Sequence, residues 1–420
     1  MIILFKRVLA GLRGDKSIWV LVTLLALFSF LPVFSASANL SLVIKNGTVY
    51  SHLYKHAIHI SLGLFFVYLA SKIKYTKLTY FVYFLMPCVF VLLIITALSN
   101  NVIAGANASR WISIPFINVS FQPSSLAFVV LNMYIAHYLS KKEDKNSPFD
   151  FKSSLWLLWL PIFAFVAVII PANLSTGLLL FVTNVLLIFL GGYPIKYLLR
   201  IGVLGGIILA GLIYFATLFP DKLPSRFSTW QARIERYTSG DEKDIDTYQT
   251  DNANIAIATG KIFGLGPGKS VQRNFLPQSS SDFIFAIIVE EYGIFGAFAL
   301  IFIYLSLFFR LIINAIRVKD AFGRLLICGL GFPIIIQAFV NMGVAVQLFP
   351  TTGQPLPLIS SGGTAIWITC ASIGIILSVT AQVNAKNETT KAVPKKVVND
   401  NFEPTDKQVA EALNVVKQNA

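Results

Sequence analysis

Residues 283–309 read FIFAIIVEEYGIFGAFALIFIYLSLFF, a run in which Glu290 and Glu291 are the only charged side chains. A helix needs about 20 mainly apolar residues to cross the hydrocarbon core of a bilayer, so this stretch predicts a transmembrane helix. Similar runs recur along the chain. Of its 420 residues, 55% are hydrophobic and only 13% are charged, against about a quarter charged in typical soluble proteins. This composition excludes a soluble globular protein, a disordered chain and a disulfide scaffold.

The apolar runs predict an all-α, polytopic membrane protein with ten transmembrane helices. One membrane domain is expected over 1–385, with a polar cytoplasmic tail at 386–420 and a large extracytoplasmic loop, 220–282, between the seventh and eighth helices. The predicted spans are 17–37, 57–73, 78–98, 123–140, 154–170, 176–193, 199–219, 283–309, 325–349 and 363–384.

The basic residues predict the orientation of these helices. Of the 34 Lys and Arg side chains, 23 lie in the two ends and in the connections on the same side as the ends, whereas the short connections on the other side hold three. Because Lys and Arg resist translocation, the rich side is predicted to be cytoplasmic, with both termini inside. The net charge of +14 is then a topology signal and a contact with lipid headgroups. It does not indicate nucleic acid as a partner.

The long 220–282 connection is expected to be functional, because irregular loops of this length are otherwise uncommon. Its sequence Gly268-Lys269-Ser270 resembles the end of a phosphate loop, but Phe263 stands where that motif requires its first glycine. Lys269 and Arg273 are therefore expected near the outer headgroups. They bind an anionic lipid head or simply anchor the loop to phospholipids, and the sequence leaves both possibilities open.

Asp282 stands at the mouth of the 283–309 span. A carboxylate there is partly desolvated, which suits a general base, but Asp immediately before a helix is also a common N-cap. Residue type alone favours the cap. Glu290 and Glu291 lie about two turns further in, where charges usually face a polar cavity or a partner. Arg110 and Lys269 are the candidate partners.

Two other outer connections carry unusual residues. In 99–122, Arg110 and Trp111 form an interface pair, because a guanidinium can grip a phosphate and an indole prefers headgroup depth; simple anchoring fits equally well. Residues 350–363 read PTTGQPLPLISSGG, with three prolines and no charge. Such a segment is predicted to be re-entrant or tightly folded, with its backbone lining a cavity or buried in protein.

These segments resemble the SEDS family, the bacterial proteins of shape, elongation, division and sporulation. Residues 264–296 carry the family pattern Gly-x-Gly…Ser-Val-Gln…Ser-Asp-Phe-Ile-Phe-Ala-Ile…Glu-Glu-Tyr-Gly, and residues 349–363 carry Pro-Thr-Thr-Gly…Leu-Pro-Leu-Ile-Ser-x-Gly-Gly. Residues 107–123 supply a third match, and the resemblance extends over about 17–385. The stretches 35–37 and 226–236 are more similar to the division branch than to the elongation branch.

The resemblance implies a peptidoglycan glycosyltransferase that polymerises lipid II, a disaccharide-pentapeptide on undecaprenyl diphosphate. Glycan strands would form at the outer face of the bacterial cytoplasmic membrane, for the division septum. Asp282 matches the family's essential aspartate and is expected to act as the base of an inverting transfer. A divalent cation, Mg or Mn, is a possible cofactor. The implied partners are a class B penicillin-binding protein and other divisome membrane proteins. The residues expected to bind substrate are Arg110, Trp111, Lys269, Gln272, Arg273, Glu290, Ser361 and Gly362.

The chain also departs from the family pattern. Ser125 and Phe128 stand where the family usually has Glu and Lys, and Asn173 replaces an aspartate, so the roles of the family's cavity residues do not carry over. A lipid II flippase, a non-catalytic divisome scaffold and the elongation counterpart are the alternative functions. A flippase would need polar groups across the whole bilayer, and the sequence has few of them toward the cytoplasmic half.

Overall fold

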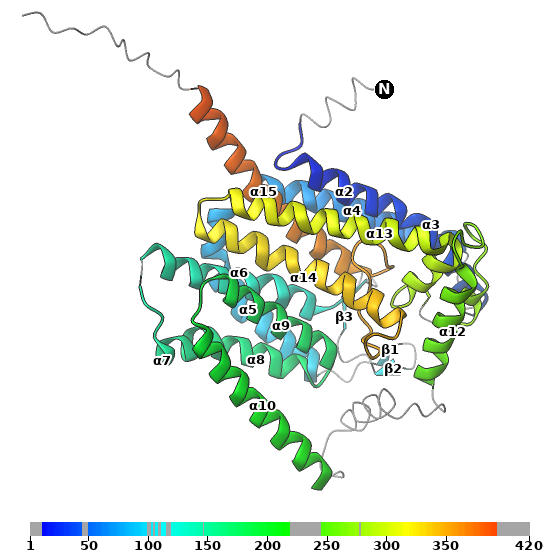
Figure 1. Cartoon of the computed structure of the whole chain (residues 1–420), viewed down its shortest axis with the longest axis horizontal. Helices are drawn as coiled ribbons and strands as arrows, with labels where there is room; N and C mark the ends of the chain where they lie inside the picture. The colour runs from blue at the N-terminus through cyan, green and yellow to red at the C-terminus, as the bar shows by residue number, and fades with distance from the viewer. Residues whose placement is uncertain are drawn as a thin grey trace, which may run out of the picture. The chain divides into compact units, whose positions relative to one another are not determined.

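The protein is almost entirely helical in a computed structural model (Figure 1). The structure describes residues 11–43, 49–98, 102–103, 106–107, 111–114, 119–145, 147–218, 245–276 and 279–392. Arg110, the stretch 226–236 and most of the predicted tail lie outside the described residues. By contacts the chain divides into one compact unit, Met1–Val383, and a second unit, Asn384–Ala420.

The first half of the chain forms helices joined by short connections. In order these are α2 (Lys16–Phe28), α3 (Phe30–Val43), α4 (Val49–Lys72), η1 (Tyr75–Lys77), α5 (Leu78–Leu98), α6 (Pro123–Asp144), α7 (Phe151–Ser154), the π-helical turn η2 (Leu155–Trp159), α8 (Leu160–Ile169), α9 (Leu174–Leu190) and α10 (Ile195–Leu218).

The second half begins with a helix of low hydrophobicity and continues with three long apolar ones. These elements are α12 (Ile245–Gly260), the 3-10 turn η4 (Gln272–Asn274), α13 (Ile284–Arg317), α14 (Ala321–Ala345) and α15 (Thr364–Ala392).

The prediction of a helical multi-pass membrane protein is confirmed. Among the described residues, seven helices are long and apolar enough to cross a membrane, and α9 is a shorter apolar helix. Helix also occurs within every predicted span, including 123–140, which lies in α6, and 199–219, which α10 covers up to Leu218. The number of crossings, ten, and the placement of both termini in the cytoplasm stay predictions.

Side-chain caps fix where several helices begin. Asp15, Asp150, Asn173 and Asp320 each occupy an N-cap position, and each side chain accepts a hydrogen bond from an amide two or three residues later. Such a cap satisfies one of the free amides of the first turn. Asn173, which stands where the family has an aspartate, therefore has a local structural role at the start of α9.

Helix α14 lies at the centre of the main unit, packed against α13 on one side and α6 on the other, with α9 also in contact (Figure 1). Small residues allow these close contacts. A Cβ at Gly329 would lie 2.8 Å from a methyl of Leu187, and one at Gly331 would lie 2.7 Å from a methyl of Leu311. Close packing through glycines is a common device in membrane helices.

The 99–122 connection contains strands that the sequence did not predict. β1 (Val102–Ile103) pairs antiparallel with β2 (Ala106–Asn107), and β3 (Ile112–Ile114) pairs antiparallel with β4 (Val119–Phe121). β-Branched residues favour such extended backbone. The strands, α12 and the connection after α14 gather toward one end of the main unit (Figure 1).

At the opposite end, Asp15 joins three helices. Its Oδ2 accepts hydrogen bonds of 2.6 Å from Arg310 Nε and 2.6 Å from Asn314 Nδ2, and its main-chain N–H donates to Thr380 Oγ1 at 3.0 Å. Burial alone would raise the pKa of this carboxyl, but the hydrogen bonds from Arg310 and Asn314 outweigh burial and hold the pKa below its ordinary value. The start of α2 is thereby fixed to α13 and α15.

Candidate active site

Asp282 lies half-buried just before helix α13. The N-cap position belongs to Phe283, whose side chain makes no capping hydrogen bond. The alternative interpretation of Asp282 as the N-cap is therefore wrong in position, because the aspartate lies one residue outside the cap.

Bonds from two other parts of the chain hold the backbone at Asp282. The carbonyl of Asp282 accepts a hydrogen bond of 2.8 Å from Asn341 Nδ2, near the end of α14. The carbonyl of Ser281 accepts one of 2.6 Å from the Ser360 hydroxyl, and that of Ser280 accepts one of 2.9 Å from the Ser361 amide. The structure thus brings the main chain of residues 280–282 beside Ser360 and Ser361. That Asp282, Ser361 and Gly362 act in one site stays a prediction.

The segment 350–363 is tightly folded and is buried at Gln354 and at residues 356–360, which confirms its predicted character, whereas Ser361 is exposed. Side chains from neighbouring helices donate hydrogen bonds to its freed carbonyls. Asn341 Nδ2 donates to Gln354 O at 2.8 Å, Gln337 Nε2 donates to Pro355 O at 2.9 Å, and the Tyr304 hydroxyl donates to Pro357 O. Buried backbone groups need such partners, and here they come mainly from α14.

Helix α13 is interrupted at Gly293, where φ is +64° and ψ is −164°. The segment 260–266 lies against this break through main-chain hydrogen bonds. Its amides at Leu265 and Gly266 donate to the carbonyls of Glu290 and Glu291, at 2.9 Å each. The break therefore exposes carbonyls that the loop can bind, and it anchors the end of the long connection to α13.

Glu290 is fully buried, and its carboxylate accepts hydrogen bonds from the main chain of the same connection. Val271 N donates to Oε1 at 2.9 Å, Gln272 N donates to the same oxygen at 3.2 Å, and the Ser270 hydroxyl donates to Oε2. The predicted partner Lys269 is exposed instead. The buried charge is thus compensated by amides and a hydroxyl, as a desolvated carboxylate requires.

Glu291 and Arg273 extend this cluster to the first helices. Glu291 Oε1 accepts hydrogen bonds from the Ser35 hydroxyl and, at 3.2 Å, from Ser270 N. Arg273 Nη1 donates to Ser35 Oγ at 3.0 Å and to Gly268 O at 2.9 Å. Arg273 therefore braces the turn that carries Lys269.

For the other predicted site residues, the structure shows burial and main-chain position for Trp111 and Gln272 only. Trp111 is half-buried just before β3, and Gln272 is half-buried in η4, where its main-chain amide donates to Glu290. Arg110, which the sequence predicts to bind substrate, lies outside the described residues.

The comparisons with known proteins identify the family. The family model for FtsW, RodA and SpoVE proteins, described as Cell cycle protein, matches residues 15–385. The chain belongs to this SEDS family. Curated relatives include a protein named Probable peptidoglycan glycosyltransferase FtsW from Geobacter metallireducens, 32% identical over 88% of this chain and 96% of the relative. The protein of the same name from Haemophilus influenzae is 29% identical over 88% of this chain and 91% of its own.

Solved structures of SEDS proteins share the fold. A chain from a peptidoglycan synthase complex that coordinates polymerisation and crosslinking superposes with a TM-score of 0.67, at 22% identity, covering 88% of this chain and 98% of that chain. The rod shape determining protein RodA of Thermus thermophilus superposes with a TM-score of 0.61, at 23% identity and with the same coverage of both chains. At such identities the likeness shows the fold alone.

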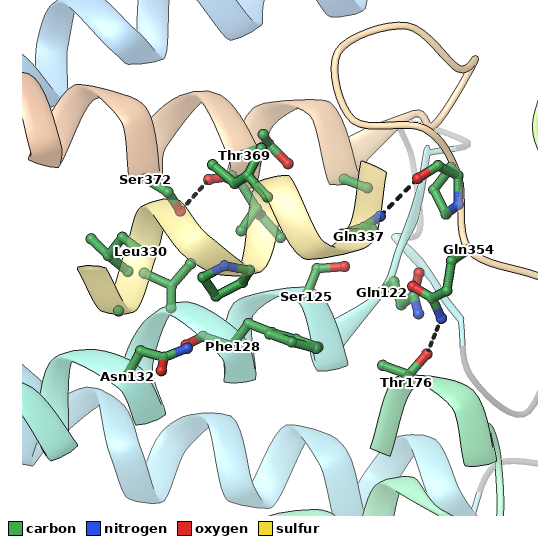
Figure 2. Close-up of a pocket in the computed structure, with 17 residues that line it drawn as sticks. Gln122, Ser125, Phe128, Asn132, Thr176, Leu330, Gln337, Gln354, Thr369 and Ser372 are labelled. Atoms are coloured by element: carbon green, nitrogen blue, oxygen red, sulfur yellow. Dashed lines mark hydrogen bonds between the residues drawn. The ribbon is translucent and has the colours of Figure 1, made fainter. Parts of the chain in front are cut away.

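Two of the positions where this SEDS chain departs from the family pattern, Ser125 and Phe128, line a cavity (Figure 2). The cavity, of about 70 Å³, lies between α6, α9, α14 and α15 and the segment after α14. Ser125, Phe128 and Thr176 line it, and none of its 17 lining residues is charged. Gln354 closes it toward α9 by donating to Thr176 Oγ1 at 2.7 Å. The cavity is therefore uncharged, with both polar and apolar residues in its lining.

Sequence reasoning missed the amides that shape this SEDS site, namely Gln337, Asn341 and Gln354. A signal was present for two of them. Gln337 and Asn341 are four residues apart inside an apolar span, so they share one helix face, and polar side chains inside a membrane span usually have a buried partner. Their partner is the charge-free segment 350–363, which also carries Gln354.

Proposed function

We propose that this SEDS protein is a peptidoglycan glycosyltransferase that polymerises lipid II at the outer face of the cytoplasmic membrane, in septal wall synthesis. The proposal rests on the family, on relatives named peptidoglycan glycosyltransferases, and on one observation in the structure. That observation is Asp282, a half-buried carboxylate at a helix mouth, whose main chain is held by hydrogen bonds from α14 and the 350–363 segment.

In the proposed reaction Asp282 takes the proton of the acceptor sugar's 4-hydroxyl. The oxygen then forms a bond to the anomeric carbon of the donor sugar, and the bond from that carbon to the lipid diphosphate breaks, with its electron pair leaving on the phosphate oxygen. Attack from the side opposite the leaving group inverts the anomeric centre, as in inverting glycosyl transfer with a single carboxylate base. The proton stays on Asp282 until solvent accepts it.

The leaving diphosphate develops negative charge, which nearby cations stabilise. Lys269 is exposed on the turn that the Glu290 cluster holds, and it is the described cation we assign to this role. Arg110 is the second, by its motif position. Substrate contacts by Trp111, Gln272, Arg273, Glu290, Ser361 and Gly362 stay predictions.

The residues described do not fit a metal site held by protein ligands. Within that part of the chain, no group of three His, Cys, Asp or Glu side chains lies close enough to hold a metal ion. The predicted divalent cation, Mg or Mn, is therefore not part of the reaction proposed here.

The alternative functions lead to different experiments. A class B penicillin-binding protein is the proposed partner, because one solved neighbour belongs to a complex that coordinates polymerisation and crosslinking. A flippase would carry polar groups across the whole span, whereas the cavity between α6, α9, α14 and α15 has a volume of only about 70 Å³ and no charged lining residue. A scaffold would need no carboxylate at position 282.

The deciding test is polymerisation of labelled lipid II by the purified protein with a class B penicillin-binding protein that has no glycosyltransferase domain. We expect glycan strands from the wild type and none from Asp282→Asn, with both proteins folded and both binding the partner. Equal product from both would exclude Asp282 as the base. No product from either would favour the flippase or the scaffold, and lipid transfer across vesicles would then separate these two.

A further inference from the structure

Asn341 holds two distant segments of the site at once. The side chain is 1% exposed near the end of α14, and its amide nitrogen donates to Asp282 O at 2.8 Å and to Gln354 O at 2.8 Å. An asparagine amide has two N–H donors, and both are used here. One side chain therefore ties the residue before α13 to the segment after α14.

The backbone at Asp282 depends on such ties because it precedes the helix. Helix α13 begins at Ile284, so the helical hydrogen-bond ladder does not fix the conformation of residue 282. Beside Asn341, the Ser360 hydroxyl donates to the neighbouring carbonyl of Ser281 at 2.6 Å and accepts from Leu356 N at 2.8 Å. Two buried polar side chains thus fix the position of the main chain from which the Asp282 side chain extends.

Asn341 is better suited to this task than to general stabilisation of the helix bundle. Both bonds go to irregular main chain, and neither joins two helices. A buried side chain whose function is packing alone would be apolar, because burying an amide is costly unless its bonds are made. The carbonyl oxygen of Asn341 has no hydrogen-bond partner among the described residues, so the amide is retained for its donors.

We infer that Asn341 is a positioning residue for glycosyl transfer, acting through the main chain of Asp282 with Ser360 as a second brace. The inference rests on the proposed function of Asp282. Catalysis by a base requires the reacting atoms to be about 3 Å apart and aligned, and a misplacement of 1 Å can cost about a hundredfold in rate. Loss of the Asn341 donors should therefore slow the chemical step and leave binding of the lipid substrate intact.

The test compares Asn341→Leu, Ser360→Ala and a matched control, Asn184→Leu. Asn184 is another fully buried asparagine, on α9, and neither of its amide atoms has a hydrogen-bond partner among the described residues. Initial rates are measured against lipid II concentration for the full-length protein with its penicillin-binding partner. The folded protein is counted from the stoichiometry of lipid II binding, so that kcat refers to competent molecules.

For Asn341→Leu we expect kcat to fall about ten- to a hundredfold while KM stays within twofold. Ser360→Ala should fall in the same direction, and Asn184→Leu should stay within twofold of wild type. If Asn341→Leu does not fold, Ser360→Ala decides the question.

Three results would overturn the inference: a folded Asn341→Leu protein with wild-type kcat, a raised KM at unchanged kcat, or an equal loss in Asn184→Leu. If Asn341→Leu does not fold, wild-type kcat in Ser360→Ala overturns it as well. Its failure is distinguishable from failure of the proposed function. An inactive Asp282→Asn beside a fully active Asn341→Leu contradicts only the positioning role, whereas an active Asp282→Asn contradicts the base itself.

Discussion

Replacing Gly293 by alanine should release the end of the long connection from helix α13. At φ +64° and ψ −164° this residue occupies a region of backbone space that is essentially restricted to glycine. A Cβ placed there would lie 2.3 Å from the carbonyl oxygen of Ile262, which is main chain and cannot rotate away. The backbone of the loop at Ile262 must therefore move away from the backbone of α13 at residue 293.

The magnitude follows from what the separation breaks. The backbone conformation alone costs about 1–3 kcal/mol for a residue with a side chain. Four main-chain hydrogen bonds join the loop to the break, from Leu265 and Gly266 to residues 290 and 291, and from residues 294 and 295 to Lys261 and Ile262. Each contributes about 0.5–1.5 kcal/mol net. The lower end of the sum is about 3 kcal/mol, which corresponds to about a hundredfold in the population of the open segment.

Limited tryptic digestion measures this opening, because Lys261 lies in the segment 260–266 and Lys269 and Arg273 follow it in the same connection. We expect cleavage there to become about a hundredfold faster in Gly293→Ala, if opening is fast relative to cleavage. Gly205→Ala is the control, since it lies in helix α10 and its Cβ would meet no atom within 4 Å. An unchanged rate of cleavage in folded Gly293→Ala would refute the reasoning.

Two further predictions concern the Glu290 cluster and, at the opposite end of the main unit, Asp15. Glu290→Gln should speed cleavage of the same segment by tenfold or more, because it weakens charge-assisted hydrogen bonds worth about 1.5–3 kcal/mol in all. The control Glu143→Gln, at a largely exposed pair with Arg324, should change the cleavage rate less than fivefold. Equal effects of the two substitutions would contradict the role of Glu290 in holding the segment. At the opposite end, Asp15 has a pKa lowered from its ordinary 3.8, so its stabilisation is complete above that value and is lost as the pH falls through the lower, folded pKa. The melting temperature of wild type should exceed that of Asp15→Asn by a constant margin down to about pH 4 and by less below it, and a margin that widens in acid would show the opposite sign.

Much of the helical architecture was predictable from local properties. The structure has helix within every span that the apolar runs predicted. The reason is that a backbone inside a bilayer must satisfy its own hydrogen bonds. The prolines of residues 350–363 correctly indicated a tightly folded, buried segment. The two short hairpins in 99–122 were missed because each pairs only two or three residues, too few for a periodic pattern to appear.

The candidate site was predictable only in part. The sequence named Asp282, Ser361 and Gly362 as site residues, and the structure joins their segments through the hydrogen bond from Ser361 N to Ser280 O. For Glu290 and Glu291 the sequence indicated a polar cavity or a partner. It offered Arg110 and Lys269 as partners, because residue type suggested a cation. Lys269 is exposed and Arg110 lies outside the described residues, whereas the main-chain amides of Val271 and Gln272 donate to Glu290. Main-chain donors have no signature in a sequence, since every residue except proline carries one.

By itself, the sequence determined a helical membrane protein of the SEDS family that has a carboxylate at the start of an apolar helix and, elsewhere in the chain, a charge-free, proline-rich segment. Apolar length and local motifs carry that information, and each acts over a few turns of helix or a single loop. Only the tertiary structure decided that Asn341 donates to Asp282 and Gln354 together, although 59 and 13 residues separate it from them. It also decided that Gly293 breaks α13 for the long connection to bind. Both depend on bringing backbone from distant parts of the chain within about 3 Å, the range of a hydrogen bond, and only the packing of the helices sets that distance.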